Sequence, residues 1–175
     1  MRVLFVCTGN ICRSPMAEAL LRAELDRRGC RDVEVASCGT WADDGVRASD
    51  GTARVLRARG IDVAAHRSRA ATRAEVAAAD LVVAMTSVHV RELTDLAPEA
   101  APKTRLLKEI ALIEPRPAGT SAAARVAELL AAPRPPARRS LDVDDPFSLT
   151  DSAYDRCLAD VDAGVAALAD VLCPG

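Results

Sequence analysis

A cysteine and an arginine with the spacing Cys-x5-Arg could act together on a phosphoryl group. Cys7 and Arg13 lie in the stretch Cys-Thr-Gly-Asn-Ile-Cys-Arg-Ser, between an apolar run that ends at Val6 and a helix start at Pro15. Backbone N–H groups in such a turn can surround an oxyanion, and an arginine can bind two of its oxygens at once. A cysteine at the base of the turn can then attack phosphorus. The pattern predicts a phosphate-binding loop with Cys7 as the nucleophile and Arg13 as the ligand of the transition state.

Such a reaction also needs an acid that protonates the leaving oxygen and later a base that activates water. Three candidates, Asp142, Asp144 and Asp145, lie close together late in the chain. Asp145 precedes Pro146, whose ring stiffens the loop and removes a competing N–H donor. We therefore predict Asp145 as the general acid, and we interpret the other two carboxylates as helix-capping or solvated side chains.

The elements that would position these residues alternate between strands and helices. Short, β-rich apolar runs predict strands at 2–6, 33–37, 79–85 and 104–107. Capping residues and apolar positions spaced by three and four predict helices at 15–28, 49–59, 87–96, 121–131 and 151–172. The alternation predicts an α/β fold: an open, doubly wound, four-stranded parallel sheet with helices on both faces and the phosphate loop after the first strand.

Length and charge exclude several classes of protein. The chain has 175 residues, of which 50% are hydrophobic and 27% charged, and this predicts a single domain over residues 1–175. Basic and acidic residues, 23 and 25 in number, are interspersed, which argues against a nucleic-acid partner. The first apolar run is too short for a signal peptide or a membrane span, so we expect a cytoplasmic protein without a membrane partner.

Residues 6–18 resemble the opening motif of the low-molecular-weight protein tyrosine phosphatase family, Val-Cys-x-Gly-Asn-Ile-Cys-Arg-Ser-Pro-x-Ala-Glu. The resemblance covers nearly all of the chain except about 114–140, and it continues in Ser37–Thr40, Gly60–Asp62, His66–Arg69, Ala79–Met85 and Asp145–Phe147. It implies a phosphomonoesterase that works through a cysteinyl-phosphate, acts most often on phosphotyrosine in proteins, and needs no cofactor or metal. The oligomeric state is not implied.

The resemblance also assigns roles to the matching residues. Cys7 would be the nucleophile, Arg13 the ligand of the phosphate and the transition state, and Asp145 the acid and then the base. Ser14 would donate a hydrogen bond to the Cys7 sulfur and ease its departure. The rest of the loop would complete the phosphate site: Thr8, Gly9, Asn10, Ile11 and Cys12.

Two residues outside the loop, Ser37 and His66, match a hydrogen-bond network that involves Asn10 and supports the loop in this family. The second histidine, His89, has no such role, and we predict it on the surface of a helix.

The cysteines beyond the nucleophile are expected as thiols, because none shows the Cys-x2-Cys spacing of a zinc site and the context favours reduced cysteine. In relatives with a second cysteine like Cys12, that thiol traps an oxidised nucleophile as a disulfide. We expect the same reversible protection of Cys7, detectable by mass spectrometry after mild peroxide. The remaining four are interpreted as packing or incidental thiols: Cys30, Cys38, Cys157 and Cys173.

Three features depart from other family members. Phe147 is followed by Ser148, where eukaryotic-like members carry a second aromatic residue, and Cys38 replaces a small alanine. The segment 114–140 is longer than in short members, and we interpret it as a lineage-specific insertion that would cover one wall of the site. Aromatic residues are scarce, yet Trp41 and Phe147 fall on loops expected to flank the phosphate, where they would sandwich an aryl ring.

Alternative functions remain open at this point. Related arsenate reductases need two further cysteines after the third strand, and residues 80–98 contain none. Related arginine phosphatases carry threonine in place of Ile11, whose branched apolar side chain would narrow the site. A sugar or metabolite phosphate is a further substrate class, because the loop recognises only the phosphate. A catalytically silent phosphate-binding module would not need the full set of Cys7, Arg13, Ser14 and Asp145.

Overall fold

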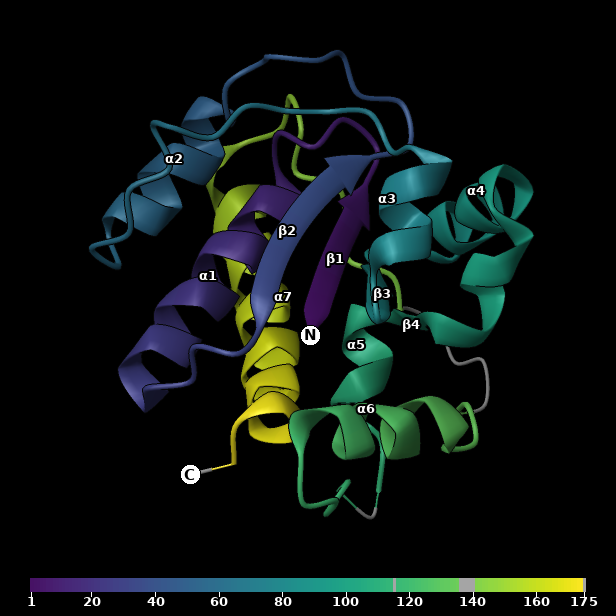
Figure 1. The fold of residues 1–175 in the computed structure, drawn as a ribbon. Helices are drawn as coiled ribbons and strands as arrows, with labels where there is room; N and C mark the ends of the chain where they lie inside the picture. Colours follow the sequence, from purple (N-terminus) through teal and green to yellow (C-terminus); the bar gives the residue numbers. More distant parts are fainter. Residues whose placement is uncertain (115, 136–140, 175) are drawn as a thin grey trace.

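A four-stranded parallel sheet with the order β2-β1-β3-β4 forms the centre of the protein (Figure 1). The structure is a computed structural model that describes residues 1–114, 116–135 and 141–174. The strands are β1 (Arg2–Cys7), β2 (Glu34–Gly39), β3 (Leu81–Ala84) and β4 (Thr104–Leu106). All four coincide with predicted apolar runs, with small differences at their ends.

Five of the helices also coincide with predictions: α1 (Arg13–Arg28), α2 (Asp50–Arg57), α4 (Ser87–Leu96), α6 (Ala122–Ala131) and α7 (Asp151–Leu172). Helices α2, α4 and α6 each begin with a capping hydroxyl that accepts a hydrogen bond from a backbone N–H of the first turn. The capping residues are Ser49, Thr86 and Ser121. Three short elements were not predicted, namely α3 (Arg73–Ala78), the 3-10 helix η1 (Pro98–Lys103) and α5 (Leu107–Ile110).

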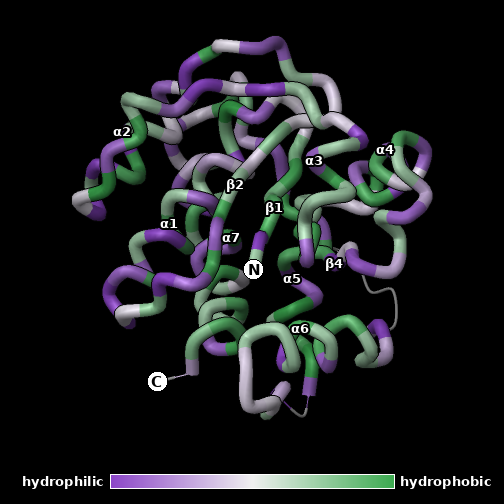
Figure 2. Tube along the Cα trace, viewed as in Figure 1, coloured by the Kyte–Doolittle hydropathy of each residue, from purple (hydrophilic) through white to green (hydrophobic). Residues whose placement is uncertain are grey.

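The sheet divides the hydrophobic core into two layers, and alternate side chains of β1 belong to one or the other. Val3 and Phe5 belong to a buried cluster with residues of α1, α2, α5, α6 and α7. Leu4 and Val6 belong to a second cluster with residues of α3, α4 and η1. Figure 2 shows hydrophobic residues along the strands, whereas the loops above the sheet are mostly hydrophilic. Because helices cover both faces of a parallel sheet, the doubly wound fold is confirmed.

The described part of segment 114–140 lies far from the carboxyl edge of the sheet. Arg125 of α6 donates to the carbonyl oxygens of Val171 and Leu172, at the end of α7. Helix α7 has 22 residues and begins beside the loop that carries Asp145, so its two ends lie about 33 Å apart. The expectation that this segment covers a wall of the phosphate site is therefore wrong for α6. Residues 115 and 136–140 lie outside the described residues.

A disulfide links Cys30 to Cys173, between the ends of α1 and α7. The prediction that these two cysteines are separate thiols is wrong. Both helices begin at the carboxyl edge of the sheet and pack side by side, so their distant ends converge. Arg28 strengthens the same corner by donating to the Cys173 carbonyl oxygen at 2.7 Å. Within the described residues, no helix is long and apolar enough to cross a membrane.

Candidate active site

The loop between β1 and α1, residues 7–14, turns its carbonyl groups outward. We call it the Cys7 loop. Five of its carbonyl oxygens accept hydrogen bonds from groups outside the loop. The donor is a backbone N–H for four of them: Thr40 donates to Cys7, Trp41 to Thr8, Ser49 to Ile11 and Met16 to Cys12. The Asn10 carbonyl oxygen accepts from the His66 ring. With these carbonyls directed away, the loop interior is left to N–H groups, which is the arrangement that binds an anion.

Asn10 fixes the shape of the Cys7 loop. Its backbone has a φ of 52°, in the left-handed region that residues other than glycine rarely adopt. The buried Asn10 amide donates to Ser14 Oγ at 2.9 Å and to Ser37 Oγ at 2.8 Å. Its Oδ1 accepts from the Arg69 N–H at 3.0 Å. These bonds use every hydrogen-bonding atom of the amide, and they hold the unfavourable backbone conformation in place.

Ser37 and His66 both form a hydrogen bond with Asn10. His66 Nε2 is 2.8 Å from the Asn10 carbonyl oxygen. Because a carbonyl oxygen only accepts, Nε2 carries the ring hydrogen. Ser37 donates to Glu18 at 2.5 Å, and Glu18 forms an ion pair with Arg22 at 2.7 Å.

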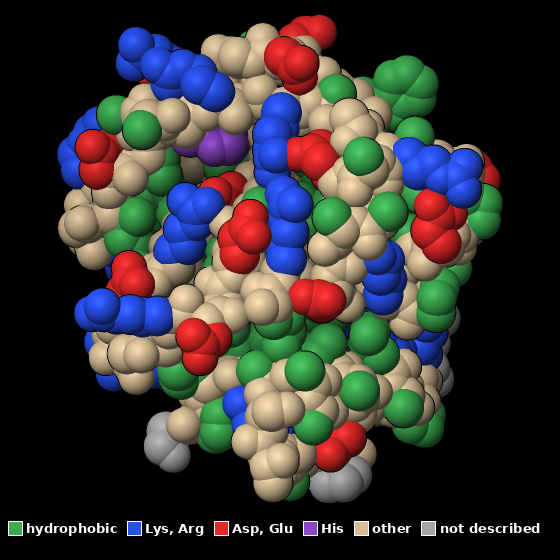
Figure 3. Space-filling model, viewed as in Figure 1, with side chains coloured by type: hydrophobic (Ala, Val, Ile, Leu, Met, Phe, Trp, Pro, Cys, Tyr) green, Lys and Arg blue, Asp and Glu red, His purple; other side chains and the backbone are tan. Residues whose placement is uncertain are grey.

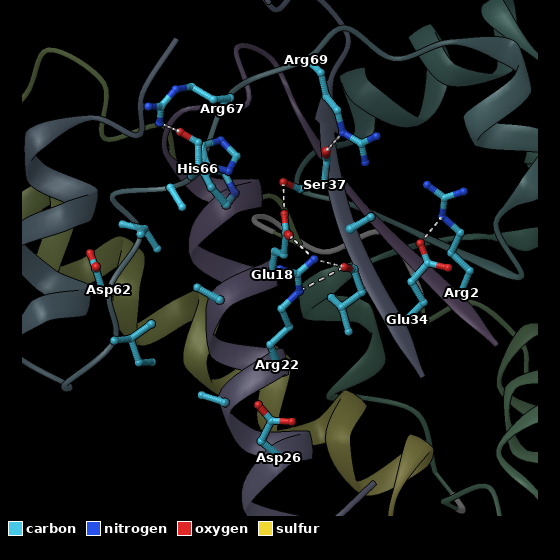
Figure 4. A pocket seen from close by; sticks show the side chains of 18 of the residues that line it. Arg2, Glu18, Arg22, Asp26, Glu34, Ser37, Asp62, His66, Arg67 and Arg69 are labelled. Carbon is cyan, nitrogen blue, oxygen red and sulfur yellow. Dashed lines mark hydrogen bonds and ion pairs between the residues drawn. The ribbon is translucent and has the colours of Figure 1, made fainter. Parts of the chain in front are cut away.

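A cavity of about 680 Å³ lies on the other side of this network, between α1, β2 and residues 60–69 (Figure 4). Ser37 and His66 therefore form a wall between the cavity and the Cys7 loop. Basic and acidic side chains alternate around the cavity on the face shown in Figure 3.

Cys7 is the last residue of β1, and its side chain is buried (2% exposed). Its Sγ lies 3.0 Å from Ser14 Oγ, the partner that the resemblance implied. Gly39 is its register partner on β2. A Cβ at Gly39 would lie 2.3 Å from the Thr8 carbonyl oxygen and 2.9 Å from the Asn10 nitrogen. Only glycine therefore lets the Cys7 loop pack this closely on β2.

Arg13, the first residue of α1, is 4% exposed. One terminal nitrogen donates to Asp145 at 2.6 Å, and the other donates to the Val143 carbonyl oxygen at 3.2 Å. The Arg13 Nε is buried and has no hydrogen-bond partner among the described residues. A buried N–H donor without an acceptor is costly, so an acceptor that the protein itself does not supply fits this position.

The loop that carries Asp145, residues 142–149, is anchored at the end of β3. We call it the Asp145 loop. The Val143 N–H donates to the Met85 carbonyl oxygen at 2.8 Å. Asp142 accepts from the Ser87 N–H at 2.8 Å, in the first turn of α4, as expected for a helix-capping side chain. Asp145 contacts Arg13 at 2.6 Å, and its role as the general acid stays a prediction.

His89 is the functional candidate that sequence reasoning missed. It is 2% exposed, so the prediction of a surface position is wrong. Its Nε2 lies 2.9 Å from Thr8 Oγ1, and its Nδ1 lies 2.9 Å from Thr86 Oγ1. The capping residue Thr86 directs the first turn of α4 toward the Cys7 loop. The signal in the sequence is Thr-x-x-His immediately after a buried strand, where the carboxyl edge must lie.

The two loop aromatics are exposed, and their contact with a substrate stays a prediction. Trp41 is 76% exposed and Phe147 is 55% exposed. The Trp41 backbone is bonded to the Cys7 loop, and its indole N–H donates to Glu92 of α4 at 2.8 Å. The Phe147 N–H donates to Asp145 Oδ1 at 3.2 Å. Both side chains thus belong to segments that contact the predicted phosphate site.

The remaining thiols are buried. Cys12 Sγ lies 3.2 Å from Ser49 Oγ and 3.6 Å from the Tyr154 hydroxyl, and burial raises the pKa of its thiol. Its predicted bond with an oxidised Cys7 stays a prediction. Burial raises the pKa of Cys38 and of Cys157 to about 12, so both remain protonated.

Residues 2–112 match the sequence model of the family described as low molecular weight phosphotyrosine protein phosphatase. The chain belongs to this family. The match contains the Cys7 loop, Ser37 and His66, and it ends before the Asp145 loop. Longer alignments with individual members of the family extend over the rest of the chain.

Two relatives of this chain are named for different phosphatase activities. The low molecular weight protein-tyrosine phosphatase A of Mycobacterium tuberculosis is 37% identical over 97% of this chain and 90% of that protein. A protein-arginine-phosphatase of Geobacillus stearothermophilus is 45% identical over 62% of this chain and 70% of that protein. The family thus contains members named for two different phosphorylated residues.

Solved structures of family members share the whole fold. A low molecular weight protein tyrosine phosphatase from T. tengcongensis matches with a TM-score of 0.78 and 34% identity, over 98% of this chain and 99% of that one. A cysteine-to-serine mutant of the YwlE arginine phosphatase, with a phosphorylated active-site serine, matches with a TM-score of 0.77 and 29% identity, over 97% of this chain and 94% of that one. The described part of segment 114–140 therefore does not disturb the fold of the low-molecular-weight phosphatases.

Proposed function

We propose that this chain hydrolyses phosphomonoesters through a cysteinyl-phosphate on Cys7, with phosphotyrosine in proteins as its substrate. The observation that carries the proposal is the buried guanidinium of Arg13, which is bonded to Asp145 and keeps an unpartnered Nε beside the Cys7 loop. A phosphate oxygen would be the missing acceptor. The phosphorylated serine in the related arginine phosphatase mutant supports a covalent phosphoryl intermediate.

The first step transfers the phosphoryl group to sulfur. The Cys7 thiolate attacks phosphorus, so that a P–S bond forms as the ester P–O bond breaks. Asp145 gives its proton to the leaving oxygen, which departs as an alcohol or a phenol. Arg13 and the N–H groups of the Cys7 loop stabilise the charge on the equatorial oxygens in the transition state.

The second step releases phosphate. Asp145, now ionised, takes a proton from water as the water oxygen attacks phosphorus. The P–S bond breaks, and Cys7 leaves as a thiolate beside Ser14 Oγ, which lies 3.0 Å away. A hydrogen bond from this hydroxyl makes the sulfur a better leaving group. Inorganic phosphate then dissociates and the enzyme returns to its starting state.

The exposed aromatic residues beside the site, Trp41 and Phe147, support phosphotyrosine as the substrate. Trp41 and Phe147 expose aromatic surface on two segments bonded to the site, which suits an aryl ring. Ile11 adds apolar surface within the Cys7 loop. The relatives named as tyrosine phosphatases align over nearly the whole chain.

Phosphoarginine in proteins is the second candidate substrate, because the relative that is 45% identical over 108 residues is named as an arginine phosphatase. An Ile11→Thr variant distinguishes the two substrates. If the isoleucine narrows the site against a phosphoguanidinium, this change raises activity on phosphoarginine relative to phosphotyrosine. An unchanged ratio would show that Ile11 does not select the substrate.

The proposal is tested with the purified protein against phosphotyrosine, phosphoserine and phosphoarginine peptides and sugar phosphates. We expect the highest kcat/KM on the phosphotyrosine peptide. Cys7→Ser should abolish turnover of p-nitrophenyl phosphate, whereas Cys38→Ala, which changes a buried thiol on β2, should retain it. Unchanged turnover by Cys7→Ser would exclude the cysteinyl-phosphate mechanism, and a preference for sugar phosphates would exclude a protein substrate.

A further inference from the structure

His89 connects the Cys7 loop to α4 through both of its ring nitrogens. Nε2 contacts the Thr8 hydroxyl at 2.9 Å, and Nδ1 contacts the Thr86 hydroxyl at 2.9 Å. Thr86 also accepts the His89 backbone N–H as the cap of α4. The His89 ring is 2% exposed, whereas Thr8 lies at the surface and Thr86 is half-buried, so both hydrogen bonds are partly buried. A histidine bonded at both ends in this way has one orientation.

The Thr8 hydroxyl contacts Arg13 as well. An Arg13 terminal nitrogen lies 3.3 Å from Thr8 Oγ1, and because a guanidinium only donates, the hydroxyl oxygen accepts. If His89 is neutral, with Nδ1 donating to Thr86, then Nε2 accepts the single hydroxyl hydrogen of Thr8. The hydroxyl lone pairs are then free to face Arg13. Burial and the nearby Arg13 charge lower the pKa of His89 to about 4, so the ring is neutral at physiological pH.

Helix α4 contacts each of the segments that make up the candidate site. His89 is bonded to the Cys7 loop, Glu92 to the indole of Trp41, and the Ser87 N–H to Asp142 in the Asp145 loop. These three residues lie within two turns of one helix. A shift of α4 would therefore change the positions of the predicted nucleophile loop, the aromatic rim and the acid together.

We propose that His89 is a positioning residue for the Arg13 guanidinium and acts on it through the Thr8 hydroxyl. The proposal rests on the function proposed above, in which Arg13 binds the phosphate. Three of the donors of Arg13 are directed to Asp145, Val143 and Thr8. The Thr8 bond therefore restricts rotation of the guanidinium plane and keeps the buried Nε directed to one place. Fixed donors stabilise a transition state better than donors that must first reorient.

A double-mutant cycle tests the chain from His89 to Arg13. The variants are His89→Leu, Thr8→Val and the combination, compared with wild type for kcat and KM on p-nitrophenyl phosphate and for competitive inhibition by inorganic phosphate. Each single variant should weaken phosphate inhibition and lower kcat/KM by about tenfold, the size expected when a hydrogen bond to a charged group is lost. The double variant should lose no more than either single variant, because all three break the same chain.

Two further variants separate positioning from a purely structural role. His89→Gln places an amide at the distance of Nε2 and should restore most of the phosphate inhibition. Thr94→Val removes a hydrogen bond between Thr94 and the Val90 carbonyl oxygen in the same helix. This change should lower the melting temperature without altering KM or the inhibition by phosphate. His89→Gln also tests the proposal if His89→Leu does not fold.

Several results would overturn the proposal. Independent, multiplicative losses in the double variant would show that His89 does not act through Thr8. Lower melting temperatures with unchanged kinetic constants would leave His89 as a packing residue. A wild-type protein that turns over none of the phosphomonoesters would instead contradict the proposed function itself. An active wild type with unaffected variants contradicts only the role of His89.

Discussion

The guanidinium of Arg13 donates to the carboxylate of Asp145 at 2.6 Å, and this ion pair joins the first residue of α1 to a loop far along the chain. The Arg13 side chain is 5% exposed, whereas that of Asp145 is 47% exposed. The arginine is thus fixed and the acid is accessible. A phosphate that binds in the Cys7 loop would compete with Asp145 for the same cation, and its arrival would release the carboxyl group toward the leaving oxygen.

Asp145→Asn should therefore separate binding from catalysis. The variant cannot give a proton, so kcat should fall moderately for p-nitrophenyl phosphate and more for esters with poor leaving groups. Inhibition by inorganic phosphate should become stronger, because a negative charge that competes for Arg13 is removed. Steady-state kinetics over a series of leaving groups checks both effects. Asp144→Asn is the matched control, and an equal loss in that variant would reassign the acid.

Trp41→Ala should raise KM for aryl phosphates more than for small alkyl phosphates, because only an aryl ring can stack on the exposed indole. We expect the ratio of the two KM changes to be about fivefold, which corresponds to about 1 kcal/mol, the middle of the range for an aromatic pair. Leu112→Ala removes a similarly exposed apolar side chain at the end of α5 and should change neither KM. Equal effects of Trp41→Ala on both classes of ester would remove Trp41 from substrate recognition.

The buried His89 should make the protein less stable in weak acid. Its pKa is about 4 in the folded protein and 6.5 in the unfolded chain. Between these values the unfolded chain binds a proton that the folded protein does not, so stability is complete above pH 6.5 and falls as the pH falls toward 4. The loss would be about 3 kcal/mol. The charges that act on the ring are Arg13, Glu92, Asp145 and Asp142.

Chemical denaturation of wild type and His89→Gln at pH 7 and pH 4.5 measures this effect. Carboxylates elsewhere titrate alike in both proteins, so the difference between the two pH dependences isolates the histidine. The wild type should lose more stability than the variant. Equal losses would mean that His89 is protonated in the folded protein over this range.

The disulfide between Cys30 and Cys173 should contribute stability and not activity. It closes a loop of 143 residues in the chain, and Cys173→Ser should lower the free energy of unfolding by about 5 kcal/mol, the value that loop-closure entropy gives for this length. Because the bond lies at the end of α7 remote from the Cys7 loop, turnover of p-nitrophenyl phosphate should not change. Melting curves with and without dithiothreitol check this. A reductant effect that persists in Cys173→Ser would assign the stabilisation to another bond.

The sequence predicted the sheet and the longer helices because each leaves a local pattern. The run at residues 81–84 is apolar throughout, which is typical of a strand buried on both faces, and it forms β3. Cys7, Arg13 and Asp145 were also selected from the chain alone, and the structure brings Arg13 and Asp145 into contact. Helices α3 and α5 have six and four residues, too few for a helical period to show.

The errors share one physical cause, which is that tertiary contacts between distant segments leave no local pattern. His89 lies on a short amphipathic helix, and only the approach of the Cys7 loop to α4 converts its position from surface to interior. Cys30 and Cys173 are brought together by the parallel packing of α1 and α7. A spacing rule for cysteines detects neighbours in sequence, and it cannot detect the convergence of two helix ends.

Trp41 is the single tryptophan of the chain. Its indole is mostly exposed beside the Cys7 loop and donates a hydrogen bond to Glu92. The intrinsic fluorescence of the whole protein therefore originates almost entirely at the rim of the candidate site. Excitation at a wavelength that spares tyrosine would report ligand binding there directly, with no label attached. The emission would also follow any movement of α4 through the same hydrogen bond, so stopped-flow mixing could time that movement against turnover.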